Sequence, residues 1–250
     1  MLGRGDQSER ASSAKSDPAR WLAIVPCYNE GASIKDTLAD LQKHVAGIRI
    51  VVIDDGSLDD TAARAAEVPG VRVVRLPANL GIGGAVATGL RYFLRHPELE
   101  VALQFDGDGQ HRADQIRRLV EPIAHGDVDV VAGSRFLVPE QGTFQSSLAR
   151  RAGIHLLSGW VWMLTGQTVT DVTSGFRAFS RKAAEALVDG YPDDYPEPLI
   201  PILLRERGLS MQEVPTPMKP RQGGSSSISG LTPVSYMAKV MIGSALFRLR

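Results

Sequence analysis

The sequence has 250 residues, and its 28 basic and 28 acidic side chains give a formal net charge of zero. This balance argues against a nucleic-acid-binding protein, because such proteins usually carry an excess of positive charge. Cys27 is the single cysteine, so no intrachain disulfide can form, and a reduced, cytoplasmic setting fits. No run of about eighteen apolar residues occurs, so we expect no membrane-spanning helix.

The first twenty residues are rich in serine, alanine, glycine and charge, which predicts a disordered lead rather than a signal peptide. From Trp21 onward, apolar runs of strand length alternate with helical patterns. This alternation predicts a single α/β domain with a mainly parallel central sheet flanked by helices. The expected strands are Trp21–Val25, Ile50–Ile53, Val71–Leu76, Val101–Leu103, Val128–Ala132 and Met211–Val214. Helices are expected after Glu30, Thr61 and Asn79, and over Ala113–His125, Ser146–Thr165, Arg181–Val188 and Leu199–Arg207.

Two carboxylates, Asp106 and Asp108, follow the expected strand Val101–Leu103. In extended backbone, residues i and i+2 point to the same side, so both carboxylates can converge on one cation. Carboxylate oxygens suit Mg²⁺ or Mn²⁺, and Mg²⁺ is commonly shared with substrate phosphates. The pattern therefore predicts a metal–diphosphate site at the carboxyl end of a strand. The simpler alternative is an ordinary turn, since Asp-Gly-Asp-Gly is typical turn composition. A calcium-binding loop is disfavoured because no glutamate stands at the twelfth position.

Other polar residues follow neighbouring strands. Asp54 and Asp55 end the second expected strand, and one of them could simply cap the next helix. Arg135 follows the strand Val128–Ala132, where a guanidinium would suit a phosphate, although a surface salt bridge is the simpler interpretation. The glycines of Gly81–Gly84 do not have the G-x-G-x-x-G spacing, and they favour either close helix packing or approach to a diphosphate.

The pattern changes in the second half of the chain. In the helix Ser146–Thr165, Trp160 and Trp162 lie on different faces, so at least one must meet a partner or an interface. Residues 219–227 are basic and glycine-rich, which fits a mobile loop that closes over phosphates, or a linker. Residues 231–250 form an amphipathic helical pattern with a basic flank, typical of a segment at a membrane surface or of a helix packed on its own domain.

Five motifs together carry a family resemblance. They are Pro26–Glu30, Asp54–Ser57, Asn79–Gly81, Asp106–His111 and Thr173–Arg177, in that order. Over residues 21–230 the chain resembles a family 2 glycosyltransferase with the GT-A fold, a Rossmann-like α/β domain. It is most similar to the branch that contains dolichyl-phosphate mannose synthase and the polyprenyl-phosphate sugar transferases.

The resemblance implies transfer of a sugar, with inversion and with Mg²⁺ or Mn²⁺, from a nucleotide-diphosphate sugar to a polyprenyl phosphate such as undecaprenyl or dolichyl phosphate. It implies nucleotide-sugar contacts from Pro26, Tyr28, Asn29, Glu30, Ile53, Asp55, Gly81, Asp106, Gly107, Asp108 and Arg135. It implies metal and diphosphate contacts from Asp106, Asp108 and Gln110, and a phosphate contact from Arg135. It also implies that Arg221 is the basic residue of the late mobile loop, and that Ser174 and Arg177 line the acceptor side.

The sequence departs from the family in two places. Many relatives carry a lysine in the late loop, where this chain has Ser225 and Ser226. Many also continue into membrane helices, whereas this sequence stops at Arg250. The stretch Asp194–Pro198 resembles bacterial relatives that work beside a small integral-membrane protein, so a peripheral position at the inner face of the membrane is expected.

The chemistry leaves the acceptor open. A lipid phosphate is already anionic, whereas a hydroxyl of a glycan or small molecule needs a general base, for which Asp171 and Glu197 are the candidates. A nucleotidyltransferase would carry a glycine-rich basic loop after the first strand, and Pro26–Glu30 is not such a loop. A non-catalytic nucleotide-binding module is the remaining alternative from another class.

Overall fold

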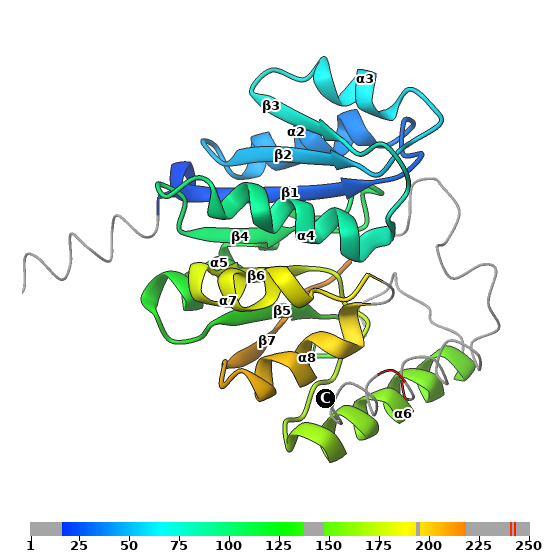
Figure 1. Cartoon of the computed structure of the whole chain (residues 1–250), viewed down its shortest axis with the longest axis vertical. Coiled ribbons are helices and arrows are strands. Elements are labelled where there is room, and N and C mark those ends of the chain that lie inside the picture. Colours follow the sequence, from blue (N-terminus) through cyan, green and yellow to red (C-terminus); the bar gives the residue numbers. More distant parts are fainter. Residues whose placement is uncertain (1–16, 138–147, 194–195, 219–240, 242, 244–250) are drawn as a thin grey trace, which may run out of the picture.

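The computed structural model describes residues 17–137, 148–193, 196–218, 241 and 243. They form a single α/β domain around a seven-stranded sheet with the order β3-β2-β1-β4-β6-β5-β7 (Figure 1). The strands are β1 (Trp21–Cys27), β2 (Arg49–Asp54), β3 (Val71–Arg75), β4 (Val101–Gln104), β5 (Val130–Ser134), β6 (Arg177–Ser180) and β7 (Met211–Pro215). Within these residues, β6 alone runs antiparallel to its two neighbours, β4 and β5, and the other pairings are parallel.

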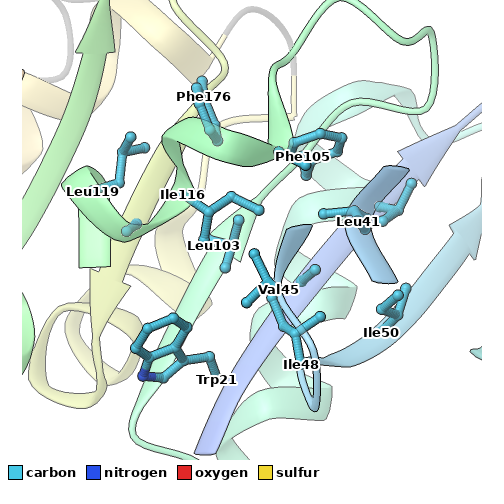
Figure 2. Close-up of a cluster of buried hydrophobic side chains, with 14 of the residues drawn as sticks. Trp21, Leu41, Val45, Ile48, Ile50, Leu103, Phe105, Ile116, Leu119 and Phe176 are labelled. Atoms are coloured by element: carbon cyan, nitrogen blue, oxygen red, sulfur yellow. The ribbon is translucent and has the colours of Figure 1, made fainter. Parts of the chain in front are cut away.

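Helices cover both faces of the sheet. They are α2 (Ile34–His44), α3 (Thr61–Ala66), α4 (Gly81–Leu94), α5 (Ile116–His125), α6 (Leu148–Thr165), α7 (Arg181–Leu187) and α8 (Pro196–Glu206), with short 3-10 turns η1 (Pro18–Arg20), η2 (Ala113–Gln115) and η3 (Val188–Gly190). β1 divides the core because alternate side chains of a strand point to opposite faces. Trp21 and Ala23 join one apolar cluster with α2 and α5, whereas Leu22 and Ile24 join a second cluster with α4, α7 and α8. Figure 2 shows the first cluster, in which Trp21 lies near Leu103 and Ile116.

The expected sheet is confirmed, with corrected boundaries. β1 continues through Pro26 to Cys27, although Pro26 was expected in the following loop. α8 begins at Pro196, where a loop was expected, because proline fits the first turn of a helix. β6 was not expected at all, since four residues directly before a helix give no periodic signal. η1 lies inside the segment 1–20 that was expected to be disordered, so ordered structure begins before Trp21.

The glycines of α4 serve close packing. A side chain at Gly89 would overlap Ile24 of β1, and one at Gly83 would overlap the backbone oxygen of Pro192. The amide of Gly83 donates to the carbonyl of Asp193 at 3.2 Å. Of the two interpretations of Gly81–Gly84, the structure supports close packing at Gly83. The start of α4 is thereby joined to the segment that leads into α8.

α6 packs through a third apolar cluster, which contains Ile154, Leu157 and Val161. Trp162 is 58% exposed, while Trp160 is partly buried, so the expected separation of the two rings is confirmed. In the expected C-terminal helix only Met241 and Gly243 fall within the described residues; both are helical, and Met241 packs against this cluster. Among the described helices, none combines the length and apolar character needed to cross a bilayer.

The two helical glycines Gly89 and Gly159 provide a matched stability test. Gly89→Ala should lower the free energy of unfolding by about 1–3 kcal/mol, because the added methyl overpacks the contact with Ile24. Gly159→Ala should raise it by about 0.5–1 kcal/mol, because nothing lies within 4 Å of the new methyl and alanine favours a helix. Urea unfolding of both variants measures the difference. Equal stability of the two would contradict the packing of α4 on β1.

Candidate functional site

The polar motifs lie together at the edge of the sheet formed by the carboxyl ends of its parallel strands. Parallel strands β1, β2, β4 and β5 all end at this edge, and the antiparallel β6 begins there. The loops after the four parallel strands therefore meet the segment 171–176 that enters β6. Ligands of open α/β sheets bind at this kind of edge, outside the carboxyl ends of the strands.

The loops after β1 and β2 are tied together by hydrogen bonds. Asn29 has a φ of 55°, in the left-handed region that asparagine tolerates better than most residues. Its amide donates to Ser57 Oγ at 3.0 Å, and its Oδ1 accepts from the amide of Leu58 at 2.8 Å. The amide of Glu30 donates to Thr61 Oγ1 at 2.9 Å. Asn29 thus holds the two loops in register, while the neighbouring Tyr28 is 42% exposed and accessible for stacking.

The two carboxylates at the end of β2 are buried and accept hydrogen bonds from backbone amides. Asp54 accepts from the amide of Ser57 at 3.1 Å. Asp55 accepts from the amide of Leu80 at 2.7 Å, at the start of α4. Burial raises the pKa of the Asp55 carboxyl, with a smaller contribution from the charge of Asp54. Asp55 therefore caps α4 rather than the helix that directly follows it, α3. The side chain of Ile53 lies wholly in the core, so only its backbone is available to a nucleotide.

The loop after β4 is a turn. Phe105 and Asp106 leave the strand, and Gly107 and Asp108 form the turn, so the expected extended geometry is wrong and the simpler alternative describes the backbone. Ser33 and Thr37 of the α2 region donate to the carbonyl of Gly107 at 3.0 and 3.2 Å. A side chain at position 107 would approach Cys27 Cβ to 3.1 Å, so the packing around Gly107 is tight.

The donor set of this turn fits a hard cation shared with phosphates. The Asp106 side chain is 32% exposed, whereas Asp108 is 4% exposed. Asp108 Oδ1 accepts a hydrogen bond from the amide of Gln110 at 3.0 Å. Within the described part of the chain, no cluster of three or more His, Cys, Asp or Glu side chains could hold a metal alone. Two carboxylates with one amide side chain suit Mg²⁺ or Mn²⁺ that completes its coordination with water and phosphate oxygens. Asp106, Asp108 and Gln110 would hold such an ion.

Gln104 also belongs to the site, although the sequence did not single it out. It is 2% exposed, and its Nε2 donates to Asp106 Oδ1 at 3.0 Å. A methyl at Gly175 would lie 2.8 Å from Gln104 Nε2 and 3.1 Å from Asp106 Oδ2, so any larger residue there would displace these side-chain ends. The signal for Gln104 was a polar residue at the end of an otherwise apolar strand.

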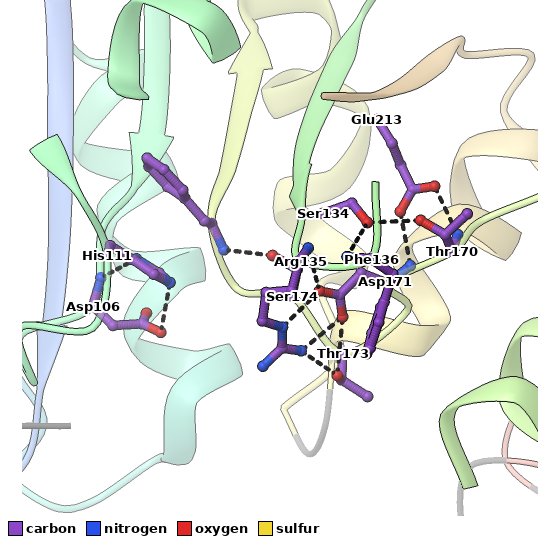
Figure 3. Close-up of polar contacts among 11 residues, drawn as sticks. Asp106, His111, Ser134, Arg135, Phe136, Thr170, Asp171, Thr173, Ser174 and Glu213 are labelled. Carbon is purple, nitrogen blue, oxygen red and sulfur yellow. Dashed lines mark hydrogen bonds and ion pairs between the residues drawn. The ribbon is translucent and has the colours of Figure 1, made fainter. Parts of the chain in front are cut away.

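Arg135 is clamped by Asp171. Asp171 Oδ2 accepts from Arg135 Nε at 2.7 Å and from the Arg135 amide at 3.1 Å, and Oδ1 accepts from a terminal guanidinium nitrogen at 2.7 Å (Figure 3). The Asp171 side chain is fully buried, and 9% of the Arg135 side chain is exposed. Glu213 of β7 fixes the same loop by accepting from the amides of Thr170 and Asp171. Of the two interpretations of Arg135, the structure shows a salt bridge, but a buried one.

Arg177 is a buried cation at the start of β6. It is 1% exposed, and a terminal nitrogen donates to the backbone carbonyl of Glu197 at 2.7 Å. In a regular helix this carbonyl would accept from the amide of residue 201, but Pro201 has no amide hydrogen. Arg177 therefore satisfies an acceptor that the proline leaves open. Ser174, also expected on the acceptor side, is 1% exposed and accepts from the amide of Phe176.

Several charges act on Glu197. Burial raises the pKa of its carboxyl, the charge of Arg177 lowers it, and the charge of Asp106 raises it further. Burial likewise raises the pKa of Tyr191. The charge of Arg177 lowers this pKa, and the charges of Glu197 and Asp106 raise it. The first turn of α8 and the turn after β4 thus face the same region. Arg221 and the pair 194–195 lie outside the described residues.

Comparison with known proteins agrees with this architecture. The family described as Glycosyl transferase family 2 matches residues 22–188. The undecaprenyl-phosphate mannosyltransferase of Micrococcus luteus is 32% identical, over 84% of this chain and 88% of that protein. The polyprenol monophosphomannose synthase of Mycolicibacterium smegmatis is 31% identical, over 93% of this chain and 92% of that one.

Solved structures show the same fold. The glucosyl-3-phosphoglycerate synthase of Mycobacterium tuberculosis, in complex with Mn²⁺, UDP and glucosyl-3-phosphoglycerate, superposes with a TM-score of 0.68 at 21% identity. The match covers 99% of this chain and 86% of that one. The carboxylate turn after β4, the clamped arginine after β5 and these matches lead to one conclusion: the chain belongs to glycosyltransferase family 2 and is a glycosyltransferase with the GT-A fold.

Proposed function

We propose that this glycosyltransferase moves a sugar from a nucleotide-diphosphate sugar to a polyprenyl phosphate, with inversion and with Mg²⁺ or Mn²⁺. The observation that carries the proposal is the gathering of Asp106, Asp108, Arg135 and Arg177 at one edge of the sheet. Curated relatives named for polyprenyl-phosphate substrates match this chain over most of its length and support the acceptor class. The solved neighbour with Mn²⁺ and UDP supports a divalent cation at such a site.

The donor half of the site is built from the ends of β1, β2 and β4. Tyr28 offers an exposed ring on which a nucleobase can stack. Asp106, Asp108 and Gln110 would hold the ion, which would supply positive charge to the leaving nucleotide diphosphate. Arg135 adds a fixed positive charge nearby, and Asp171 holds its guanidinium so that little reorganisation is needed as the bond breaks.

The residues expected on the acceptor side favour an acceptor that is already anionic. Asp171 was one of two candidates for a general base, but the Arg135 clamp occupies both of its oxygens. A lipid phosphate needs no base, because it is already an anionic nucleophile. A hydroxyl acceptor is the second candidate, favoured by Glu197, because burial raises the pKa of its carboxyl and makes it a stronger base.

A substrate panel tests the proposal. Nucleotide sugars based on UDP and GDP are incubated with undecaprenyl phosphate, dolichyl phosphate or soluble hydroxyl acceptors, with Mn²⁺ or with EDTA. Product mass and anomeric configuration by NMR give the acceptor and the stereochemistry. We expect Mn²⁺-dependent transfer to a polyprenyl phosphate with inversion. If the protein binds the nucleotide but neither transfers the sugar nor hydrolyses the donor, it is a non-catalytic binding module instead.

Asp108→Asn should abolish transfer while the fold is kept. The substitution is nearly isosteric, but a neutral amide binds Mg²⁺ or Mn²⁺ far less well than a carboxylate. Asp189→Asn is the matched control, because Asp189 is highly exposed and pairs only loosely with Arg91, at 3.9 Å. Turnover at several Mn²⁺ concentrations and thermal unfolding are measured together. Near wild-type turnover of Asp108→Asn in metal-limited buffer would remove Asp108 from the metal site.

Asp171→Asn should destabilise the protein strongly. Removing one partner of a buried ion pair leaves the other charge uncompensated, at a cost of about 3–5 kcal/mol. Asp60→Asn, which breaks the exposed pair with Arg64, should lower the stability far less. Urea unfolding compares the two variants. If Asp171→Asn were as stable as wild type while inactive, Asp171 would act as a base rather than as the clamp of Arg135.

Glu197→Gln separates the two acceptor classes. With a lipid phosphate, turnover should stay within about tenfold of wild type, because no general base is needed. With a hydroxyl acceptor, turnover should fall by about 10²–10⁴-fold. The wild-type rate would then also drop on acidification, through a pKa above the usual carboxyl range, because burial favours the protonated, inactive form of Glu197. Turnover profiles from pH 5 to 8 measure this, with the exposed Glu206→Gln as control.

A further inference from the structure

The imidazole of His111 lies directly behind the proposed metal-binding turn. The side chain is 3% exposed. Its ring stacks on Phe176, with centroids 4.7 Å apart and planes at 19°, and meets the edge of Phe105 at 5.5 Å. Two aromatic neighbours from different strand ends therefore fix the plane of the imidazole. Neither the donor nor the acceptor role proposed above uses this residue.

One hydrogen bond defines which ring nitrogen of His111 accepts. The backbone amide of Asp106 donates to His111 Nδ1 at 3.0 Å (Figure 3). An amide can only donate, so Nδ1 must carry a lone pair and the neutral ring holds its proton on Nε2. Nε2 lies 3.5 Å from Asp106 Oδ2. This distance exceeds that of a standard hydrogen bond, so the contact is a weaker electrostatic one.

The Asp106 carboxylate is thus oriented from two sides. Gln104 donates to Oδ1, and His111 Nε2 lies 3.5 Å from Oδ2. The bond to Nδ1 also closes the loop from residue 106 to residue 111, which carries Asp108 and Gln110. Groups that orient the ligands of a metal are nearly as important for affinity as the ligands, and their loss typically costs 10–100-fold.

We propose that His111 is a positioning residue, which fixes both the Asp106 carboxylate and the turn around it for a divalent cation. This inference rests on the proposed function only in that it uses the same cation site. A purely structural role for the ring would be filled by any side chain that packs between Phe105 and Phe176. The positioning role requires the two nitrogen contacts as well.

Direct Mn²⁺ binding to the full-length protein tests this, measured from the loss of the free-ion EPR signal in the absence of substrate. His111→Phe keeps an aromatic ring but removes both nitrogen contacts, so Mn²⁺ should bind about tenfold more weakly than to wild type. His111→Gln can accept from the Asp106 amide and donate to its carboxylate, so binding should stay within about threefold. His155→Phe, at an exposed position on α6, is the matched control and should not change binding.

The outcomes are distinct. Unchanged Mn²⁺ affinity of a folded His111→Phe, with a lowered melting temperature only, overturns the positioning role. If the Phe variant does not fold, the smaller His111→Leu takes its place with the same expectation. Wild-type protein that binds no Mn²⁺ at millimolar concentration overturns both the inference and the proposed metal dependence. Wild-type protein that binds Mn²⁺ tightly but transfers no sugar overturns the proposed function and leaves the role of His111 to be decided by the variants.

Discussion

The antiparallel insertion of β6 between β4 and β5 is the constraint on which the site depends. A parallel strand at this position would send its entering loop to the opposite edge of the sheet. Because β6 runs backwards, the segment 171–176 arrives beside the turn that carries Asp106. The clamp of Arg135, the glycine that clears space for the carboxylate and the aromatic ring behind His111 all come from this one segment or from the first residues after it.

Burial determines how firmly the charged side chains of the site are held in place. Asp171, Asp54 and Arg177 are almost wholly excluded from water, and each is held by specific partners rather than left to solvent. Desolvation makes such contacts strong but also makes a broken contact expensive. Asp106 is different, since about a third of its side chain remains exposed. The protein thus surrounds one accessible carboxylate with polar groups that cannot easily rearrange.

Much of this arrangement could be predicted from the sequence. Apolar runs such as Val51–Ile53 identified most of the strands, and the motif order identified the family, because buried parallel strands leave a clear local pattern. β6 could not be found in this way, since its pairing partners lie far away in the chain. The clamp between Arg135 and Asp171 spans 36 residues and depends on the same long-range pairing. Glu30, Asn29 and Asp55 were assigned to the nucleotide by resemblance, whereas their contacts in the structure also hold loops and a helix start in place.

The bond between Arg177 and the carbonyl of Glu197 has a consequence for how this chain tolerates change. Pro201 interrupts the ladder of α8 and would ordinarily weaken the helix, while a buried guanidinium would ordinarily lack partners. Here Arg177 donates to the carbonyl that Pro201 leaves without its helical partner, while Arg177 Nε has no hydrogen-bond partner within the described part of the chain. An amide restored at position 201 would compete for the acceptor that Arg177 uses, so changes at the two positions are expected to be non-additive. The proline in α8 is thus energetically linked to the buried charge at the start of β6.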